Sequence, residues 1–162
     1  MTTGNIFQII HESETRYFQY FYTDQNYLGG DLIWVFNQKA KTNNLVEIIK
    51  SGYNFCFYTT LDTGVKLKMW TLIGNMDILP EMQFYPKFRW RDMETDDWYI
   101  LQYDEKTNVG KTLNEELLKI QPVTFEFPWG AVESMILSKE EFLKQINNFE
   151  EKHYKVMKDK IK

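Results

Sequence analysis

The residue types that most often catalyse reactions or bind metals are scarce in this 162-residue chain. The only histidines are His11 and His153, and the only cysteine is Cys56. No His-x-His, His-Glu-x-x-His or Cys-x-x-Cys spacing occurs, so a zinc site would lack its usual ligands. Cys56 lies in the aromatic run 53–58, where burial favours an inert thiol. The sequence therefore predicts neither a metal nor a reactive nucleophile. A catalytic pair of carboxylates stays open, because no particular pair is indicated.

The most unusual segment is residues 87–99, with the sequence KFRWRDMETDDWY. Three cations alternate with two aromatic residues, and four acids follow. One interpretation is a charged hairpin loop with internal ion pairs. The other is a protein-recognition loop, because Arg, Trp and Tyr dominate the energetics of protein interfaces. The candidate partner-binding residues are Arg89, Trp90, Asp92, Glu94, Asp96 and Asp97.

The charge of the chain favours a basic partner over a nucleic acid. The formal net charge is −4 and the pI is about 5.3. Seven lysines and five acids lie in residues 139–162, so the first 138 residues alone carry a net charge of −6. An acidic body attracts basic partners, although the same charge also serves ordinary solubility. The chain shows neither a leader-like start nor a run of eighteen apolar residues, which leads us to expect a cytoplasmic protein with no membrane association.

The elements that must position these residues are mostly strands. The chain has 5 Trp, 10 Tyr and 12 Phe residues, and such aromatic content is typical of strands and a dense core. The first three runs are separated by short polar links, which predicts an antiparallel meander. The runs expected to be extended are 6–10, 17–22, 31–36, 53–60, 66–73, 98–103, 123–127 and 131–137. A turn is expected at 62–64, and prolines at 80 and 86 interrupt the stretch 74–90.

Two helices are predicted between and after these strands. Residues 42–44 begin a short helix after the third strand, and Gly52 lies where a left-handed cap would end it. A capping box at 138–141 begins a C-terminal helix over 139–157. Its apolar stripe is expected to contain Phe142, Ile146, Phe149 and Met157.

The predicted fold class is therefore α+β. We expect mainly antiparallel strands in a strongly bent sheet or small half-open barrel, in a single domain over 1–162 with a β-rich body at 4–137. Within it, Trp70 is expected in the core. Gly74 follows an apolar run and is expected at a bulge or a turn with positive φ.

Several short elements follow one another along the chain. The segment 69–75 contains a W-x-x-I-G element, the proline-containing stretches 79–81 and 85–88 come next, and the aromatic strand at 98–101 follows, while 4–9, 16–20 and 30–36 lie near the start. In this order of elements, residues 4–137 resemble the bacterial polymorphic-toxin immunity proteins of immunity protein family twenty-six, in which a W-x-x-I-G element is similarly followed by a proline-containing stretch and an aromatic strand.

The resemblance implies a cytoplasmic protein without catalysis that binds and neutralises a cognate toxin domain, such as a basic nuclease. It supplies no catalytic residue and implies no cofactor. An alternative function is a small β-barrel module that binds nucleic acid through the aromatic and basic residues of 87–90. The acidic body and the acids at 92–97 count against that alternative, because they would repel phosphates. A hydrolase with a carboxylate pair is the third hypothesis.

Overall fold

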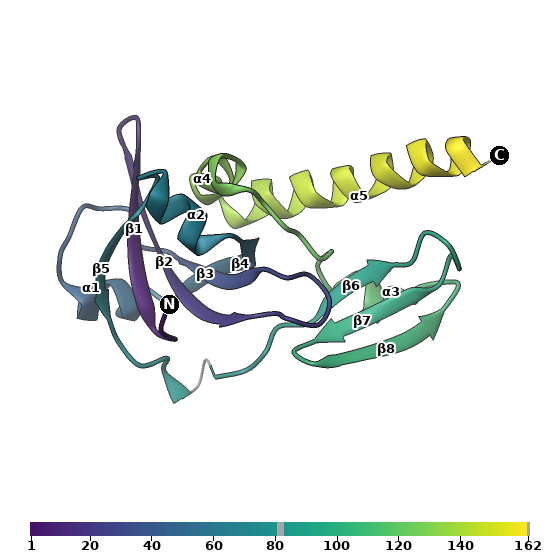
Figure 1. Ribbon diagram of the computed structural model, residues 1–162, viewed down its shortest axis with the longest axis horizontal. Coiled ribbons are helices and arrows are strands. Elements are labelled where there is room, and N and C mark those ends of the chain that lie inside the picture. The colour runs from purple at the N-terminus through teal and green to yellow at the C-terminus, as the bar shows by residue number, and fades with distance from the viewer. Residues whose placement is uncertain (81–82, 162) are drawn as a thin grey trace. The chain divides into compact units, whose positions relative to one another are not determined.

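The computed structural model describes residues 1–80 and 83–161, with side chains as far as Tyr154. The chain divides into two compact units, each of which contains one antiparallel sheet (Figure 1). Unit 1 comprises Met1–Gln83 and Phe125–Lys139, and unit 2 comprises Phe84–Thr124 and Glu140–Lys162. These boundaries cut across the predicted division into a body at 4–137 and a C-terminal helix.

Unit 1 contains a five-stranded sheet with the strand order β4-β3-β2-β1-β5. Its strands are β1 (Asn5–His11), β2 (Glu14–Thr23), β3 (Asp31–Phe36), β4 (Tyr53–Thr59) and β5 (Thr71–Asn75). The predicted meander of the first three strands is confirmed, because β1 pairs with β2 and β2 pairs with β3, both antiparallel. The last strand, β5, joins the opposite edge beside β1.

One face of this sheet packs against α1 (Leu45–Lys50), the predicted short helix. The side chain of Asn44 accepts hydrogen bonds from the backbone N–H groups of Val46 and Glu47, which satisfies donors that a helix start leaves free. Gly52 has a φ of 73° just beyond the helix, as the predicted left-handed cap requires. The core on this side is built from Ile6, Tyr17, Phe36, Ile48 and Ile49.

The strand residues that alternate with this set form a second aromatic core. Phe7 and Phe18 stack with ring centroids 5.1 Å apart, and the ring of Trp70 meets Phe18 edge-on at 5.5 Å. Trp70 is 3% exposed, so its predicted place in the core is confirmed. The predicted bulge is also confirmed, because the β1–β5 pairing shifts register beside Gly74.

Unit 2 contains a three-stranded sheet with the order β6-β7-β8 and most of the long C-terminal helix. Its elements are β6 (Phe88–Arg91), β7 (Trp98–Gln102), β8 (Glu105–Gly110), α3 (Glu115–Leu118) and α5 (Lys139–Ile161). Both strand pairs are antiparallel hairpins. The α+β class, the antiparallel strands and both predicted helices are therefore confirmed, with the strands divided between two open sheets.

Four local predictions were wrong in whole or in part. The turn expected at 62–64 and the start of the extended run at 66–73 lie in and just after α2 (Leu61–Lys66). The strand expected at 131–137 is largely helical, because α4 spans Pro128–Met135. Pro128 at the first helical position and the buried Ala131, Val132 and Met135 explain this helix, since the missing N–H of proline costs nothing there. Residues 123–127 form no strand and contribute only an isolated bridge between Phe125 and Tyr58. A second isolated bridge, in unit 2, joins Arg89 to Pro122, just before this run.

Two predictions in unit 2 need correction. Strand β8 lies at a sheet edge and was missed, because most of its residues are polar and none is buried. The stripe predicted for α5 is right at Phe142 and Ile146, which are 0% and 4% exposed, and wrong at Phe149, which is 69% exposed. The helix continues to Ile161, beyond its predicted end. Met157 in that stripe, and Glu81 in the proline-containing stretch, lie outside the described side chains and residues.

Candidate functional site

The four predicted acidic residues lie in the loop that joins β6 to β7. The backbone N–H of Asp92 donates to the carbonyl of Asp97 at 2.8 Å, and that of Asp96 donates to the carbonyl of Asp92 at 3.0 Å. Oδ1 of Asp92 also accepts from the backbone N–H groups of Glu94 and Thr95, at 2.8 and 3.1 Å. Asp96 has a φ of 62°, a conformation that Asp tolerates better than most residues. A single aspartate side chain therefore organises the loop.

Ion pairs fix the second half of the same loop. The guanidinium of Arg91 pairs with Asp96. Lys111 at the end of the hairpin lies 2.9 Å from Oδ1 of Asp97, and the amide of Asn108 donates to Oδ2 at 3.2 Å. Hydrogen bonds from Lys111 and Asn108 hold the pKa of Asp97 below its usual value, and those from the backbone lower the pKa of Asp92. The expected hairpin with internal ion pairs is thus present.

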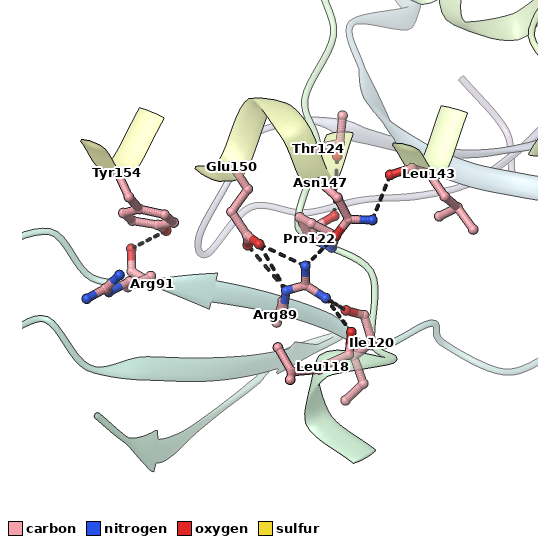
Figure 2. A network of polar contacts seen from close by, with 10 residues as sticks. All are labelled: Arg89, Arg91, Leu118, Ile120, Pro122, Thr124, Leu143, Asn147, Glu150 and Tyr154. Atoms are coloured by element: carbon pink, nitrogen blue, oxygen red, sulfur yellow. Dashed lines mark hydrogen bonds and ion pairs between the residues drawn. The ribbon is translucent and has the colours of Figure 1, made fainter. Parts of the chain in front are cut away.

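Arg89 is the anchor of the hairpin, as Figure 2 shows. Its guanidinium is buried and donates to the carbonyls of Leu118 and Ile120, to the side-chain oxygen of Asn147 and to both carboxylate oxygens of Glu150. The ion pair with Glu150 measures 2.8 Å, and the two side chains are 6% and 14% exposed. These partners belong to α5 and to the segment around α3, so one side chain ties three parts of unit 2 together.

Arg91 lies two residues further along the same face of β6. Its guanidinium carbon lies 4.8 Å from the ring centroid of Tyr154 and 5.3 Å from that of Trp98. The hydroxyl of Tyr154 donates to the backbone carbonyl of Arg91 at 3.3 Å, and burial raises the pKa of that hydroxyl to about 12. A hollow of about 470 Å³ opens here, lined by both arginines, Trp98, Tyr154 and carboxylates of α5. Each of the two arginines forms an ion pair with a carboxylate, so the hollow offers an anion no uncompensated guanidinium.

The opposite face of the hairpin carries Trp90. Its ring lies 5.6 Å from that of Tyr99, and Nζ of Lys106 lies 4.2 Å from the Trp90 centroid and 4.1 Å from the Tyr99 centroid. A lysine that lies against two aromatic rings gains cation–π attraction and buries its methylene chain. The sequence did not indicate this lysine, because it lies on the unpredicted strand β8.

The six predicted residues therefore share one hairpin but occupy different environments. Arg89 is buried and bound within unit 2, and Trp90 is half-buried beside Lys106. Asp96 and Asp97 are ion-paired, while Glu94 is exposed at the loop tip. The prediction also missed the residues that hold the loop, namely Arg91, Lys106, Asn108, Lys111, Asn147, Glu150 and Tyr154.

The residues considered for other chemistry lie elsewhere. Cys56 is 1% exposed in β4, and burial raises the pKa of its thiol, as the aromatic sequence around it predicted. Among the residues that the structure describes, no group of three His, Cys, Asp or Glu side chains is arranged to hold a metal ion. In the same residues, no helix combines the length and the apolar character that a membrane span needs.

Comparison with known proteins yields no relative from which a role could be taken. No protein-family model, curated protein or solved structure matches the chain.

Proposed function

We propose that this protein is a cytoplasmic, non-catalytic immunity protein that binds a cognate bacterial toxin domain and covers its active site. The resemblance of residues 4–137 to the immunity proteins motivates the proposal. The observation that carries it is the loop at 92–97, an acidic recognition loop that hydrogen bonds and ion pairs hold in one conformation.

Such a loop suits a binding role because it is ordered before the partner arrives. Association costs free energy when loops and side chains lose their freedom, and a preorganised loop reduces that cost. Asp92 and Asp97 supply the order, and Arg89 fixes the base of the loop. Glu94 at the exposed tip then meets the partner, and the acidic field attracts a basic toxin surface such as a nuclease cleft.

The alternative, a nucleic-acid-binding module, fits the hairpin less well. Single-stranded nucleic acids bind where aromatic rings offer their faces for base stacking and cations contact the backbone. Lys106 lies against the faces of Trp90 and Tyr99, at 4.2 and 4.1 Å, so a base would have to displace an ammonium group. The adjoining acidic loop would also repel the phosphates.

The experiment compares two charge reversals that change the net charge equally. Glu94→Lys alters the loop tip without touching Asp92 or the ion pairs, whereas Glu140→Lys alters an exposed acid in the first turn of α5. The experiment needs a toxin domain encoded beside this protein's gene as the partner. Association is followed by stopped-flow fluorescence at low and moderate salt.

We expect the wild-type protein to bind that domain in a 1:1 complex and to abolish its toxicity. Glu94→Lys should slow association about tenfold at low salt and leave dissociation nearly unchanged, because charge acts mainly on the encounter rate. Equal association rates for the two variants would refute the loop assignment. A wild-type protein that neither binds nor protects against the domain would refute the immunity function.

A further inference from the structure

A second exposed surface, on unit 1, combines stacked aromatic rings with carboxylates. Phe127 and Trp129 are 58% and 61% exposed, and their rings stack 5.9 Å apart with an angle of 17° between their planes. Single exposed apolar residues are common on protein surfaces. A stacked Phe–Trp pair is more informative, because these residues are enriched where proteins meet.

The backbone beneath these rings is firmly held. The N–H of Glu126 donates to the carbonyl of Tyr58 in β4 at 2.8 Å, and Phe125 forms a parallel bridge with the same residue. The Phe125 ring presses on Gly30, where a Cβ would lie 2.5 Å from Cε2. It also meets the Phe127 ring edge-on at 5.5 Å. The backbone that carries the exposed Phe127–Trp129 pair is therefore held in one conformation on the side of Phe127.

The next turn fixes the other side of the pair. Pro128 occupies the first position of α4, and the N–H of Ala131 donates to the carbonyl of Phe127 at 2.8 Å. Because backbone freedom is already lost around both rings, a ligand that stacks on them pays little further ordering entropy.

Two carboxylates neighbour the ring-bearing residues: Glu126 precedes Phe127, and Glu133 lies one helical turn after Trp129 on the same side of α4. Oε2 of Glu126 lies over Gly130, where a Cβ would be only 2.7 Å away. Burial and repulsion by Glu133 both raise the pKa of Glu126, so its negative charge is poorly accommodated in the unbound protein. In the part of the chain that the structure describes, neither carboxylate forms an ion pair with a lysine or an arginine.

We infer that the surface formed by Glu126, Phe127, Trp129 and Glu133 binds an arginine side chain of the partner protein. This inference rests on the proposed function only in taking that partner to be the toxin domain. A guanidinium group fits the surface because it stacks on aromatic rings and donates paired hydrogen bonds to a carboxylate. It would also relieve the repulsion between the two glutamates. A nucleic acid or an anionic membrane would instead meet two negative charges beside the rings.

The test uses the full-length protein and hexa-arginine peptide, with hexa-lysine for comparison. The titrations are done at moderate salt, and the indole N–H signals of the ¹⁵N-labelled protein are followed by NMR. The signal of Trp129 is assigned as the one that is missing from the spectrum of Trp129→Phe. We expect a saturable shift at Trp129 and weaker binding of hexa-lysine, because an ammonium group lacks the planar fork.

Matched variants separate this surface from general acidity. Trp129→Ala should weaken hexa-arginine binding about tenfold, whereas Phe149→Ala removes a similarly exposed aromatic ring and should have little effect. Glu126→Gln should weaken hexa-arginine binding several-fold, whereas Glu140→Gln should leave hexa-arginine binding unchanged. A Trp129 signal that does not move, or equal effects of Glu126→Gln and Glu140→Gln, would overturn the inference.

The toxin domain separates this inference from the proposed function. If the wild-type protein binds the domain and Trp129→Ala binds it equally tightly, the surface is not the docking site and the immunity function stands. If the wild-type protein does not bind the domain while the peptide titration succeeds, the immunity function fails and the arginine site stands. Self-association or phosphatidylcholine-vesicle binding that Trp129→Ala abolishes would identify another occupant and overturn the inference.

Discussion

Replacing Arg89 by methionine should strongly destabilise unit 2, because its guanidinium is buried and bound on several sides. Methionine is an unbranched, apolar side chain that fills most of the same space. The substitution removes every hydrogen bond that the guanidinium donates to Leu118, Ile120, Asn147 and Glu150. Removing one partner of a buried ion pair costs about 3–5 kcal/mol, because the other charge stays buried. Each orphaned carbonyl adds about 1–3 kcal/mol. Glu150 is 14% exposed and can turn toward water, which offsets part of that loss. We expect a net loss of about 4 kcal/mol.

The free energy of unfolding can be measured by urea denaturation. Tryptophan fluorescence and circular dichroism should both be recorded in the same titration, since the two units need not unfold together. Hydrogen exchange should locate the loss in the middle of α5. Glu150→Gln alone should cost about 2 kcal/mol, and the double variant should cost about 2 kcal/mol less than the sum, because the two residues share one interaction. Lys119→Met is the control, since it breaks an exposed pair with Glu116 and should cost below about 0.5 kcal/mol.

A loss below about 1 kcal/mol for Arg89→Met would refute this reasoning, because the two orphaned carbonyls of Leu118 and Ile120 alone should cost more than that. Additive effects of the Arg89 and Glu150 substitutions would refute the coupling between them, even if each were destabilising alone.

Two further predictions concern other parts of the molecule. Gly64→Ala should destabilise unit 1 by about 1–3 kcal/mol, measured by thermal unfolding, because its Cβ would lie 1.9 Å from Cζ2 of the Trp70 ring. An unchanged melting temperature would contradict that packing. The raised pKa of Tyr154, about 12, predicts stability that is complete below pH 10 and lost as the pH rises toward 12, because only the unfolded state ionises easily in that range. Burial also raises the pKa of Tyr53 and Tyr58, so the test is the difference in absorbance at 295 nm between wild type and Tyr154→Phe, which isolates Tyr154. That difference should titrate well above pH 10, and a difference that titrates near pH 10 would contradict the prediction.

The elements that could be predicted from sequence are those whose pattern is local. Strand β3 is apolar at the positions that point to either face of the sheet, and α1 combines a cap at Asn44 with Gly52 just beyond its end. Neighbouring residues in the sequence therefore suffice to define each element. Strand β8 contains mostly polar residues and buries none of them, so only its pairing with β7 defines it. In α4, the apolar run suggested a strand, although Pro128 at the first turn was a helix signal available in the sequence.

The site was predictable only in part, for the same physical reason. The cations, aromatics and acids at 87–99 identified the hairpin and its internal ion pairs. Arg89, however, pairs with Glu150, which is 61 residues away in the chain, and no local pattern specifies that partner. The burial of Arg89 follows from this distant contact. Strand alternation alone would have indicated that Arg89 and Arg91 share a face that Trp90 does not.

This division of roles changes how the acidic loop should be tested. Asp92 and Asp97 are structural, because one organises the backbone and the other holds Lys111 and Asn108. Reversing all four acidic charges would therefore disorder the loop and remove its charge together, and slower association would have two causes. Glu94 forms no ion pair among the described side chains, so its substitution changes the charge while the loop keeps its conformation. A selective effect of Glu94→Lys would consequently be stronger support for a recognition loop than a larger effect of the fourfold reversal.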